Sequence, residues 1–272
     1  MPRGSLRCGA MQTDFTHRQL RSVDKRVHRL GLALNMGIDA DGVAAAFERG
    51  ISYIFYTRMR TGKSLSVLRE ALKRDREKYV VAAGPTFGFF RGGVRSGAES
   101  TLKRLGVDYL DVFQLMWLGT ASAWTESTID ELCKLREEGK VRALGVSIHD
   151  RERAGRLAAD SVLDLFMIRY NAAHPGAERD IFPHLEKRKP SVVAYTATSW
   201  RKLLKRPGGY DGPVMTAGDC YRFCLSNPHV DVVLSGPKSR AELEENLAAV
   251  ERGPLDADEL RWMRGFGHTV HG

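Results

Sequence analysis

Eight nearly continuous apolar runs are the feature of this 272-residue chain that most restricts its fold. Strands with one solvent-facing side alternate apolar and polar residues, whereas strands covered on both faces stay apolar throughout. The runs therefore predict the strands of a parallel sheet that is covered on both sides. They lie at residues 30–34, 53–56, 79–83, 109–117, 141–148, 162–170, 192–197 and 230–234.

Between these runs, apolar residues recur at the spacing of helices that pack by one face. Eight strand–helix units in about 250 residues predict an α/β fold, a closed (β/α)8 TIM barrel. The alternative, an open doubly wound sheet, would be expected to carry a GxGxxG turn after its first strand, and residues 30–34 contain none. The helical groups are Leu65, Leu68 and Leu72; Ile129, Leu132 and Leu135; Leu157 and Ala158; Ile181, Phe182 and Leu185; and Leu243, Leu247 and Val250.

Three glycines and one serine mark helix boundaries. Gly50, Gly106 and Gly139 each follow a helical segment and precede a strand run, so they predict left-handed caps that end helices. Ser239, followed three residues later by Glu242, predicts a capping box at the start of the last helical group.

The composition favours a single soluble domain. With 43% apolar and 28% charged residues, the chain can bury one large core and lacks the bias of a disordered protein. No run reaches the roughly 20 apolar residues of a membrane span, and the first thirty residues lack the apolar centre of a signal peptide. We therefore expect a cytoplasmic protein with no membrane partner.

Charge and cysteine content narrow the possible ligands. The net charge of +9 invites a nucleic-acid partner, but the basic residues are dispersed and no aromatic strand platform or helix-turn-helix pattern accompanies them. A small ligand that bears phosphate accounts for the charge better, so we expect no nucleic acid. The four cysteines are too few for a disulfide scaffold and have no histidines at metal-ligand spacing, so no metal site is expected. Cys220 and Cys224 are expected to pack on one helix face.

Five motifs in order resemble those of the aldo-keto reductases, and the similarity runs from about Phe15 to the end of the chain. The resemblance implies a TIM barrel whose base is plugged by a hairpin within residues 15–27, and an NADP(H) cofactor bound without a Rossmann domain. We assign residues 1–14 to an N-terminal tail and 15–272 to a single domain. The motifs are residues 31–33, 104–111, 137–147, 170–171 and 245–246.

The resemblance also places the nicotinamide end of the cofactor. The matching positions are Ser147, which would bind the carboxamide, and Tyr195, which would stack on the ring. Two further family contacts are missing, because Ile148 stands where the family usually has asparagine and Met167 where it has glutamine. Two lost hydrogen bonds of about 1 kcal/mol each would weaken binding roughly thirtyfold.

The adenine and phosphate end matches the family better. Lys238, Ser239 and Arg240 open the last helical group, where the family holds the 2′-phosphate, and Asn246 with Glu245 stands where it meets the adenine. A helix N-terminus with added cations suits a phosphate, which favours NADP over NAD. The alternative is that Ser239 only caps the helix and that Lys238 and Arg240 are solvated.

The catalytic positions depart from the family in every case. The slots for its aspartate, tyrosine, lysine and histidine hold Phe55, Arg60, Pro85 and Met116. General acid catalysis requires a titratable group within hydrogen-bonding reach and contributes about 10²- to 10⁴-fold. Standard chemistry of the family is therefore not supported.

Tyr56, Arg60 and His149 are weak candidates for a replacement acid or base, since an arginine beside a phenol favours the phenolate and histidine titrates near neutrality. Each has an alternative structural role: Tyr56 and Arg60 on the rim or in a loop, and His149 at a helix entry.

The substitutions leave an apolar mouth to the barrel. Phe55, Phe87, Met116 and Trp117 are expected to line a pocket for an apolar or aromatic small molecule, although aromatic loops also seal barrel mouths. The leading hypothesis is an aldo-keto reductase-like, NADP(H)-dependent oxidoreductase that acts on a carbonyl or alcohol with a degenerate tetrad. The alternatives are an NADP-binding pseudoenzyme or regulatory protein, and a lyase, dehydratase or isomerase on the same barrel. The substrate and the oligomeric state stay open.

Overall fold

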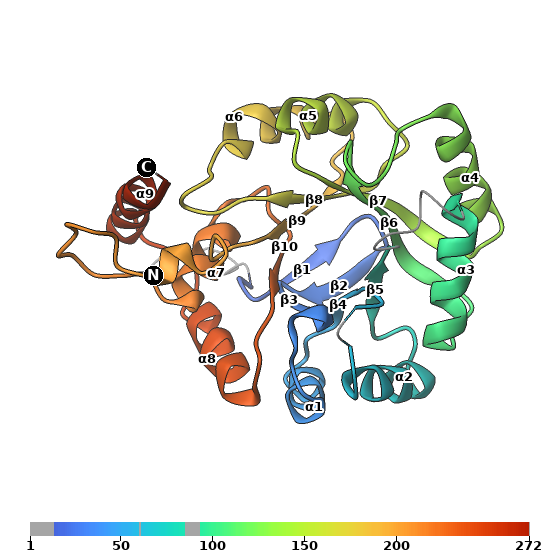
Figure 1. Cartoon of the computed structure of the whole chain (residues 1–272), viewed down its shortest axis with the longest axis horizontal. Coiled ribbons are helices and arrows are strands. Elements are labelled where there is room, and N and C mark those ends of the chain that lie inside the picture. The colour runs from blue at the N-terminus through green and yellow to red at the C-terminus, as the bar shows by residue number, and fades with distance from the viewer. Residues whose placement is uncertain (1–13, 60, 85–92, 272) are drawn as a thin grey trace, which may run out of the picture.

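The structure, a computed structural model, describes residues 14–59, 61–84 and 93–271. Its centre is a closed barrel of eight parallel strands in the order β10-β3-β4-β5-β6-β7-β8-β9, with helices around it (Figure 1). The predicted TIM barrel is confirmed, and each of the eight apolar runs overlaps one strand, although β6, β9 and β10 each extend one residue beyond the run. The strands are β3 (Leu30–Ala33), β4 (Tyr53–Tyr56), β5 (Val80–Ala83), β6 (Leu110–Leu118), β7 (Val141–Ile148), β8 (Leu165–Arg169), β9 (Ser191–Tyr195) and β10 (Val232–Ser235).

Helices follow most of the strands. The longer ones are α1 (Ala40–Glu48), α2 (Ser64–Arg74), α3 (Gly93–Leu105), α4 (Glu126–Glu137), α5 (Arg151–Ala159), α7 (Ala217–Ser226), α8 (Arg240–Glu251) and α9 (Ala257–His271). The short ones are η1 (Leu34–Met36), α6 (Ala177–Asp180), η2 (Phe182–His184) and η3 (Lys202–Leu204). None of the helices in the described part of the chain is both long enough and apolar enough to span a bilayer.

One helical prediction is wrong. Apolar residues between Ile181 and Leu185 predicted an α-helix, but α6 ends before this segment, at Asp180, and the segment contains only the 3-10 turn η2. Pro183 lies inside this turn, and a proline inside an α-helix removes a backbone donor and collides with the preceding turn. The apolar side chains are buried all the same, because Ile181, Phe182 and Leu185 pack on the core.

The predicted helix ends are confirmed, and one predicted start is corrected. Gly50, Gly106 and Gly139 have φ angles of +85°, +71° and +73°. The Ser239 hydroxyl accepts a hydrogen bond from the backbone N–H of Glu242 at 3.3 Å, as a cap should. The Glu242 carboxylate, however, accepts from the N–H of Lys238 at 2.9 Å instead of closing the box on Ser239.

Strand residues alternate between the inside of the barrel and the layer under the helices. On β4, Tyr53 and Phe55 belong to the interior cluster, whereas Ile54 and Tyr56 pack in the outer core. Full burial of each large apolar side chain contributes about 1.5–3 kcal/mol, so these two layers account for most of the stabilisation. Cys220 and Cys224 are both buried in the outer layer, as predicted for packing residues.

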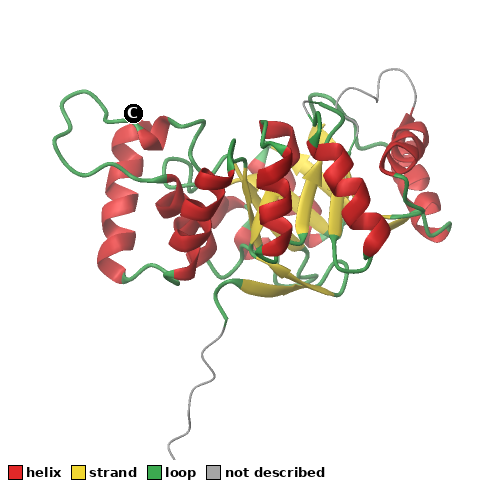
Figure 2. Cartoon of the chain, turned by 90° about the horizontal axis from the view of Figure 1, so that it is seen from below, coloured by secondary structure: helices red, strands yellow, loops and turns green. Residues whose placement is uncertain are grey.

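A two-stranded antiparallel hairpin closes the base of the barrel, as the resemblance implied. It consists of β1 (His17–Leu20) and β2 (Lys25–His28), and it lies below the barrel in Figure 2. Leu20 and Val27 insert into the interior cluster. Asp14 accepts hydrogen bonds through its carboxylate from the backbone N–H and the hydroxyl of Thr16, just before β1. With the base plugged, the carboxyl end of the barrel is the end at which a ligand can enter.

Candidate active site

The mouth of the barrel is formed by the carboxyl ends of its eight strands. Part of it is apolar, and we call the two side chains that make it, Phe55 and Met116, the apolar wall. Phe55 on β4 and Met116 on β6 point inward and are only 5% and 3% exposed. Trp117 follows in a left-handed conformation, with φ of +47°, where β6 shifts its register against β7. Two residues predicted for this side, Pro85 and Phe87, lie outside the described residues.

The structure separates the three candidate acids. Tyr56 lies on the outer face of the barrel, and its hydroxyl accepts a hydrogen bond from the Arg104 guanidinium of α3 at 2.9 Å. It therefore faces away from the mouth, on the side of the barrel that packs under the helices. Arg60 lies outside the described residues. His149 directly follows β7 and lies on the rim.

Three residues on neighbouring strands form the rim row, namely His149, Arg169 and Tyr195. Arg169 ends β8 and is paired in register with Tyr195, which ends β9. His149 follows Ile148, which is paired with Ile168, and so comes next to Arg169. The Tyr195 hydroxyl lies 3.0 Å from Nε2 and 3.2 Å from Nδ1 of His149. In the barrel order, β8 lies opposite β4, so Arg169 faces Phe55 across the mouth, whereas Met116 lies on β6, next to β7.

The two aromatic members of the rim row are neutral at pH 7. Burial lowers the pKa of His149 from its ordinary value, and the nearby charge of Arg169 lowers it further. Burial raises the pKa of Tyr195 to about 12, against the opposing influence of Arg169. Both residues can therefore orient a ligand by hydrogen bonding, but neither is a strong acid near neutrality.

Ser147 lies one layer deeper, beside Met167 of β8. Its side chain is completely buried, and its hydroxyl makes no hydrogen bond of good geometry with a described residue, although it lies close enough to the Tyr195 hydroxyl to favour the phenolate form of that side chain. A buried hydroxyl without a partner costs about 1–3 kcal/mol, so such groups usually have a role in binding. Met167 has no group to offer a carboxamide, and Ile148 packs in the outer core.

The predicted phosphate site lies at the N-terminus of α8. Ser239 caps the helix, and Arg240 makes only an exposed contact of 3.7 Å with Asp41. None of the described carboxylates pairs with the side chain of Lys238. The N-terminus of α8 therefore presents two cationic side chains that make few contacts with the rest of the described structure.

The predicted adenine contacts agree with the structure only in part. Glu245 is exposed and accessible. Asn246 is 6% exposed, and its side-chain amide donates to the Ser235 hydroxyl at 3.3 Å. Ser235 in turn donates to the Tyr221 hydroxyl at 3.1 Å. The Asn246 amide therefore serves the packing of α8 on the barrel, and contact with an adenine would require this bond to change.

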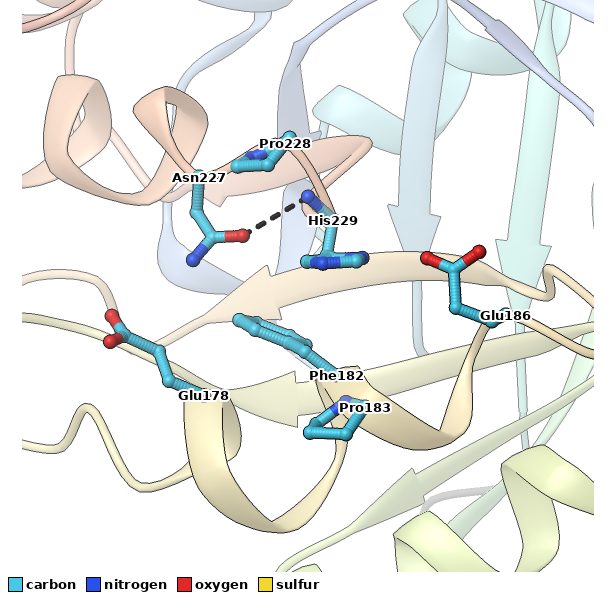
Figure 3. A pocket seen from close by; sticks show the side chains of 7 residues that line it. All are labelled: Glu178, Phe182, Pro183, Glu186, Asn227, Pro228 and His229. Atoms are coloured by element: carbon cyan, nitrogen blue, oxygen red, sulfur yellow. Dashed lines mark hydrogen bonds between the residues drawn. The ribbon is translucent and has the colours of Figure 1, made fainter.

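Two surface hollows lie away from the mouth. One is lined by Phe182, His229 and their neighbours, with the two rings stacked at 5.2 Å between centroids (Figure 3). The other is lined by Arg18 and Gln19 of the basal hairpin, together with His229. Neither contains a member of the rim row or the apolar wall, so we do not assign the reaction to them.

Arg169 is the site residue that the sequence did not single out. Its one signal was a lone cation at the end of an otherwise apolar strand, a pattern that also fits a solvated strand end. Only the register shows that it lies between His149 and Tyr195 on the mouth.

Comparison with known proteins agrees with this architecture. The pattern described as the Aldo/keto reductase family matches residues 24–206. The methylglyoxal reductase YeaE of Escherichia coli (strain K12) is 30% identical over 158 residues, which span 56% of this chain and 55% of that protein. The chain thus matches about half the length of that relative. The L-galactose dehydrogenase of Arabidopsis thaliana is 24% identical over 264 residues, with 81% of each chain covered.

Solved structures share the fold. The holo form of the aldo-keto reductase AKR11C1 from Bacillus halodurans superposes with a TM-score of 0.77 at 23% identity, over 92% of this chain and 96% of that one. An aldo-keto reductase from Klebsiella pneumoniae in complex with NADPH gives 0.75 at 23% identity, over 93% and 95%. Since the family pattern covers more than half of the 272 residues and the barrel is the one these structures have, the chain belongs to the aldo/keto reductase family.

Proposed function

We propose that the protein is an NADP(H)-dependent oxidoreductase that interconverts a small carbonyl compound and its alcohol without the usual catalytic tetrad of the family. The single observation that carries the proposal is the fully buried hydroxyl of Ser147, which makes no hydrogen bond of good geometry with a described residue and lies near Tyr195 at the mouth of this barrel. The NADPH bound to the Klebsiella relative supports the choice of cofactor. We also propose that residues 15–272 act as one domain in the cytoplasm.

The residues present fit the cofactor at both of its ends. Ser147 would accept a hydrogen bond from the carboxamide, and Tyr195 would cover the ring. Lys238 and Arg240 would bind the 2′-phosphate, since their charges and the unpaired N–H groups of the α8 N-terminus favour an anion. Ile148 and Met167 add no polar contact, so the nicotinamide end is expected to bind less tightly than in relatives with the amide side chains.

Bound NADPH would supply the hydride which, together with one proton, converts a carbonyl to an alcohol and leaves NADP⁺. The groups of this chain that can take part near the oxygen are His149 and Tyr195, through their hydrogen-bonding N–H and O–H. Because the pKa of Tyr195 is raised, the pKa of His149 is lowered, and the family's tyrosine–lysine pair is missing, acid catalysis is weak. Turnover is expected to be about 10²- to 10⁴-fold slower than with an activated donor.

The test is a fluorescence titration with NADPH and NADH. NADPH should bind at least tenfold more tightly, and Lys238→Met should remove most of this preference while leaving NADH binding unchanged. Lys103→Met, an exposed position on α3, is the matched control and should have no effect. If neither nucleotide binds at high micromolar concentration, the proposed function is wrong.

A cofactor-binding protein without turnover is the second candidate, favoured by the raised pKa of Tyr195 and the lowered pKa of His149. Single-turnover oxidation of bound NADPH over a panel of aldehydes and ketones separates the two. Slow oxidation that His149→Ala abolishes supports the enzyme and assigns His149 to the site. NADPH binding with no oxidation of any carbonyl supports the second candidate.

A further inference from the structure

Arg169 is a half-buried cation with no counter-ion. None of the described aspartate or glutamate side chains lies within ion-pair distance, and residues 1–13, 60, 85–92 and 272 contain neither residue type. Arg151, which begins α5 at the same end of the barrel, is by contrast paired with Asp180 at 2.8 Å. A guanidinium that loses water without gaining an anion is destabilising, so an unpaired one on a mouth points to an anion that arrives with a ligand.

The surroundings of Arg169 are also positive. Burial lowers the pKa of His174 to about 4, and the charge of Arg169 is the next largest cause, followed by other basic groups that include Lys202. The same guanidinium lowers the pKa of His149. The mouth on the side of β8 and β9 therefore combines a fixed cation with neutral hydrogen-bonding groups, while Phe55 on β4 lies across the mouth and Met116 on β6 adds apolar surface between them.

We infer that Arg169 binds a carboxylate of the substrate, so that the substrate class is an oxo acid or hydroxy acid with an apolar body. The guanidinium can hold both carboxylate oxygens in its planar fork, with the neighbouring His149 and Tyr195 hydrogen-bonded beside it. The apolar body would lie against Phe55 and Met116. The inference rests on the proposed function, because it names the substrate of the same site.

The test compares phenylpyruvate with phenylacetone, in which a methyl group replaces the carboxylate. Binding is measured by calorimetry with and without NADPH, and turnover by NADPH oxidation. Phenylpyruvate should bind at least tenfold more tightly than phenylacetone. Arg169→Met should weaken the binding of phenylpyruvate about 10- to 100-fold, as expected for the loss of a charge-assisted contact. The affinity for phenylacetone should change less than threefold.

Two further variants make the result specific. Arg169→Lys keeps the charge but not the fork, so its affinity for phenylpyruvate should lie between those of wild type and Arg169→Met. Arg261→Met removes the same charge from an exposed position on α9 and should leave both affinities unchanged. Thermal unfolding of each variant checks that the fold is intact.

The outcomes separate the inference from the proposed function. If NADPH binds but phenylpyruvate and phenylacetone bind equally, the inference is wrong and the function stands. If Arg169→Met weakens NADPH binding tenfold and leaves the affinity for phenylpyruvate unchanged, the guanidinium binds a cofactor phosphate and the inference is again wrong. If phenylpyruvate binds through Arg169 while NADPH does not bind, the carboxylate site stands and the proposed function fails.

Discussion

The buried hydroxyl of Ser147 should have opposite effects on the stability of the nucleotide-free protein and on the binding of NADPH. Its oxygen makes no hydrogen bond of good geometry with a described residue, so Ser147→Ala should stabilise the nucleotide-free protein by about 1 kcal/mol. The same change should weaken the binding of NADPH about tenfold, because the carboxamide loses its hydrogen bond to the Ser147 hydroxyl. Thermal unfolding and nucleotide titration of one variant check both effects. A destabilised variant with unchanged NADPH affinity would show that the hydroxyl is merely structural.

His28 gives the fold a dependence on pH. It is 4% exposed, and its Nδ1 accepts a hydrogen bond from the N–H of Leu30 at 3.0 Å. Burial lowers its pKa from 6.5 to about 4, with a smaller contribution from His17. Because the folded pKa lies below the unfolded one, the stabilisation is complete above pH 6.5 and is lost as the pH falls towards 4.

Urea unfolding at pH 7 and pH 4.5 measures this effect. The contribution of His28 should amount to about 2–3 kcal/mol between the two conditions. His28→Asn keeps an acceptor and does not titrate, so its loss on acidification should be smaller by that amount. His268→Asn, at an exposed position on α9, should behave like wild type. Equal pH dependence in wild type and His28→Asn would contradict the assignment.

At the scale of elements, helix α9 offers two glycines with opposite surroundings. A Cβ built on Gly267 would lie 2.2 Å from the backbone oxygen of Ala172, whereas one on Gly265 meets nothing within 4 Å. Gly267→Ala should therefore force the helix away from the loop after β8 and destabilise the protein by about 2–4 kcal/mol. Gly265→Ala should stabilise it by up to about 1 kcal/mol through helix propensity.

Urea denaturation of both variants provides the measurement. Each is the control for the other, because the chemical change and the helix are the same and only the neighbouring backbone differs. If both substitutions had equal effects, the close approach of α9 to Ala172 would not be a feature of the folded protein.

At the scale of the whole molecule, Asp111 joins the basal hairpin to the barrel. Its side chain is fully buried, and its carboxylate accepts hydrogen bonds from Lys25 of β2 at 2.9 Å, Arg76 at 2.7 Å and the N–H of Val81 at 2.9 Å. Asp111→Ala leaves these donors without their acceptor and should cost about 3–5 kcal/mol. Glu77→Gln, which alters a 63% exposed carboxylate of the same cluster, should cost less than about 1 kcal/mol.

Limited proteolysis together with urea unfolding tests this connection. Asp111→Ala should expose the hairpin to cleavage at denaturant concentrations at which Glu77→Gln is still resistant. Equal resistance of the two variants would show that the hairpin is held by Leu20 and Val27 alone.

The sequence predicted the fold better than the site, for a physical reason. A strand that is buried on both faces is a continuous apolar run, which can be recognised without knowing its neighbours. A left-handed helix cap such as Gly106 can likewise be recognised from the residues beside it in the sequence. The helix predicted over residues 181–185 does not form, because Pro183 interrupts the apolar pattern and lacks the backbone N–H that an α-helix would use. The alternation that turns Phe55 inward and Tyr56 outward needed the strand register, which local patterns specify less firmly.

The sequence by itself determined the barrel, the basal hairpin and the family, because each of these depends on residue type along the chain. Tertiary structure alone decided that Tyr56 is bonded to Arg104 on the outside and that Asn246 is engaged within the fold. It also placed Arg169 without a counter-ion between His149 and Tyr195. Such facts depend on which groups meet across strands far apart in sequence, and the closing of the barrel brings those groups together.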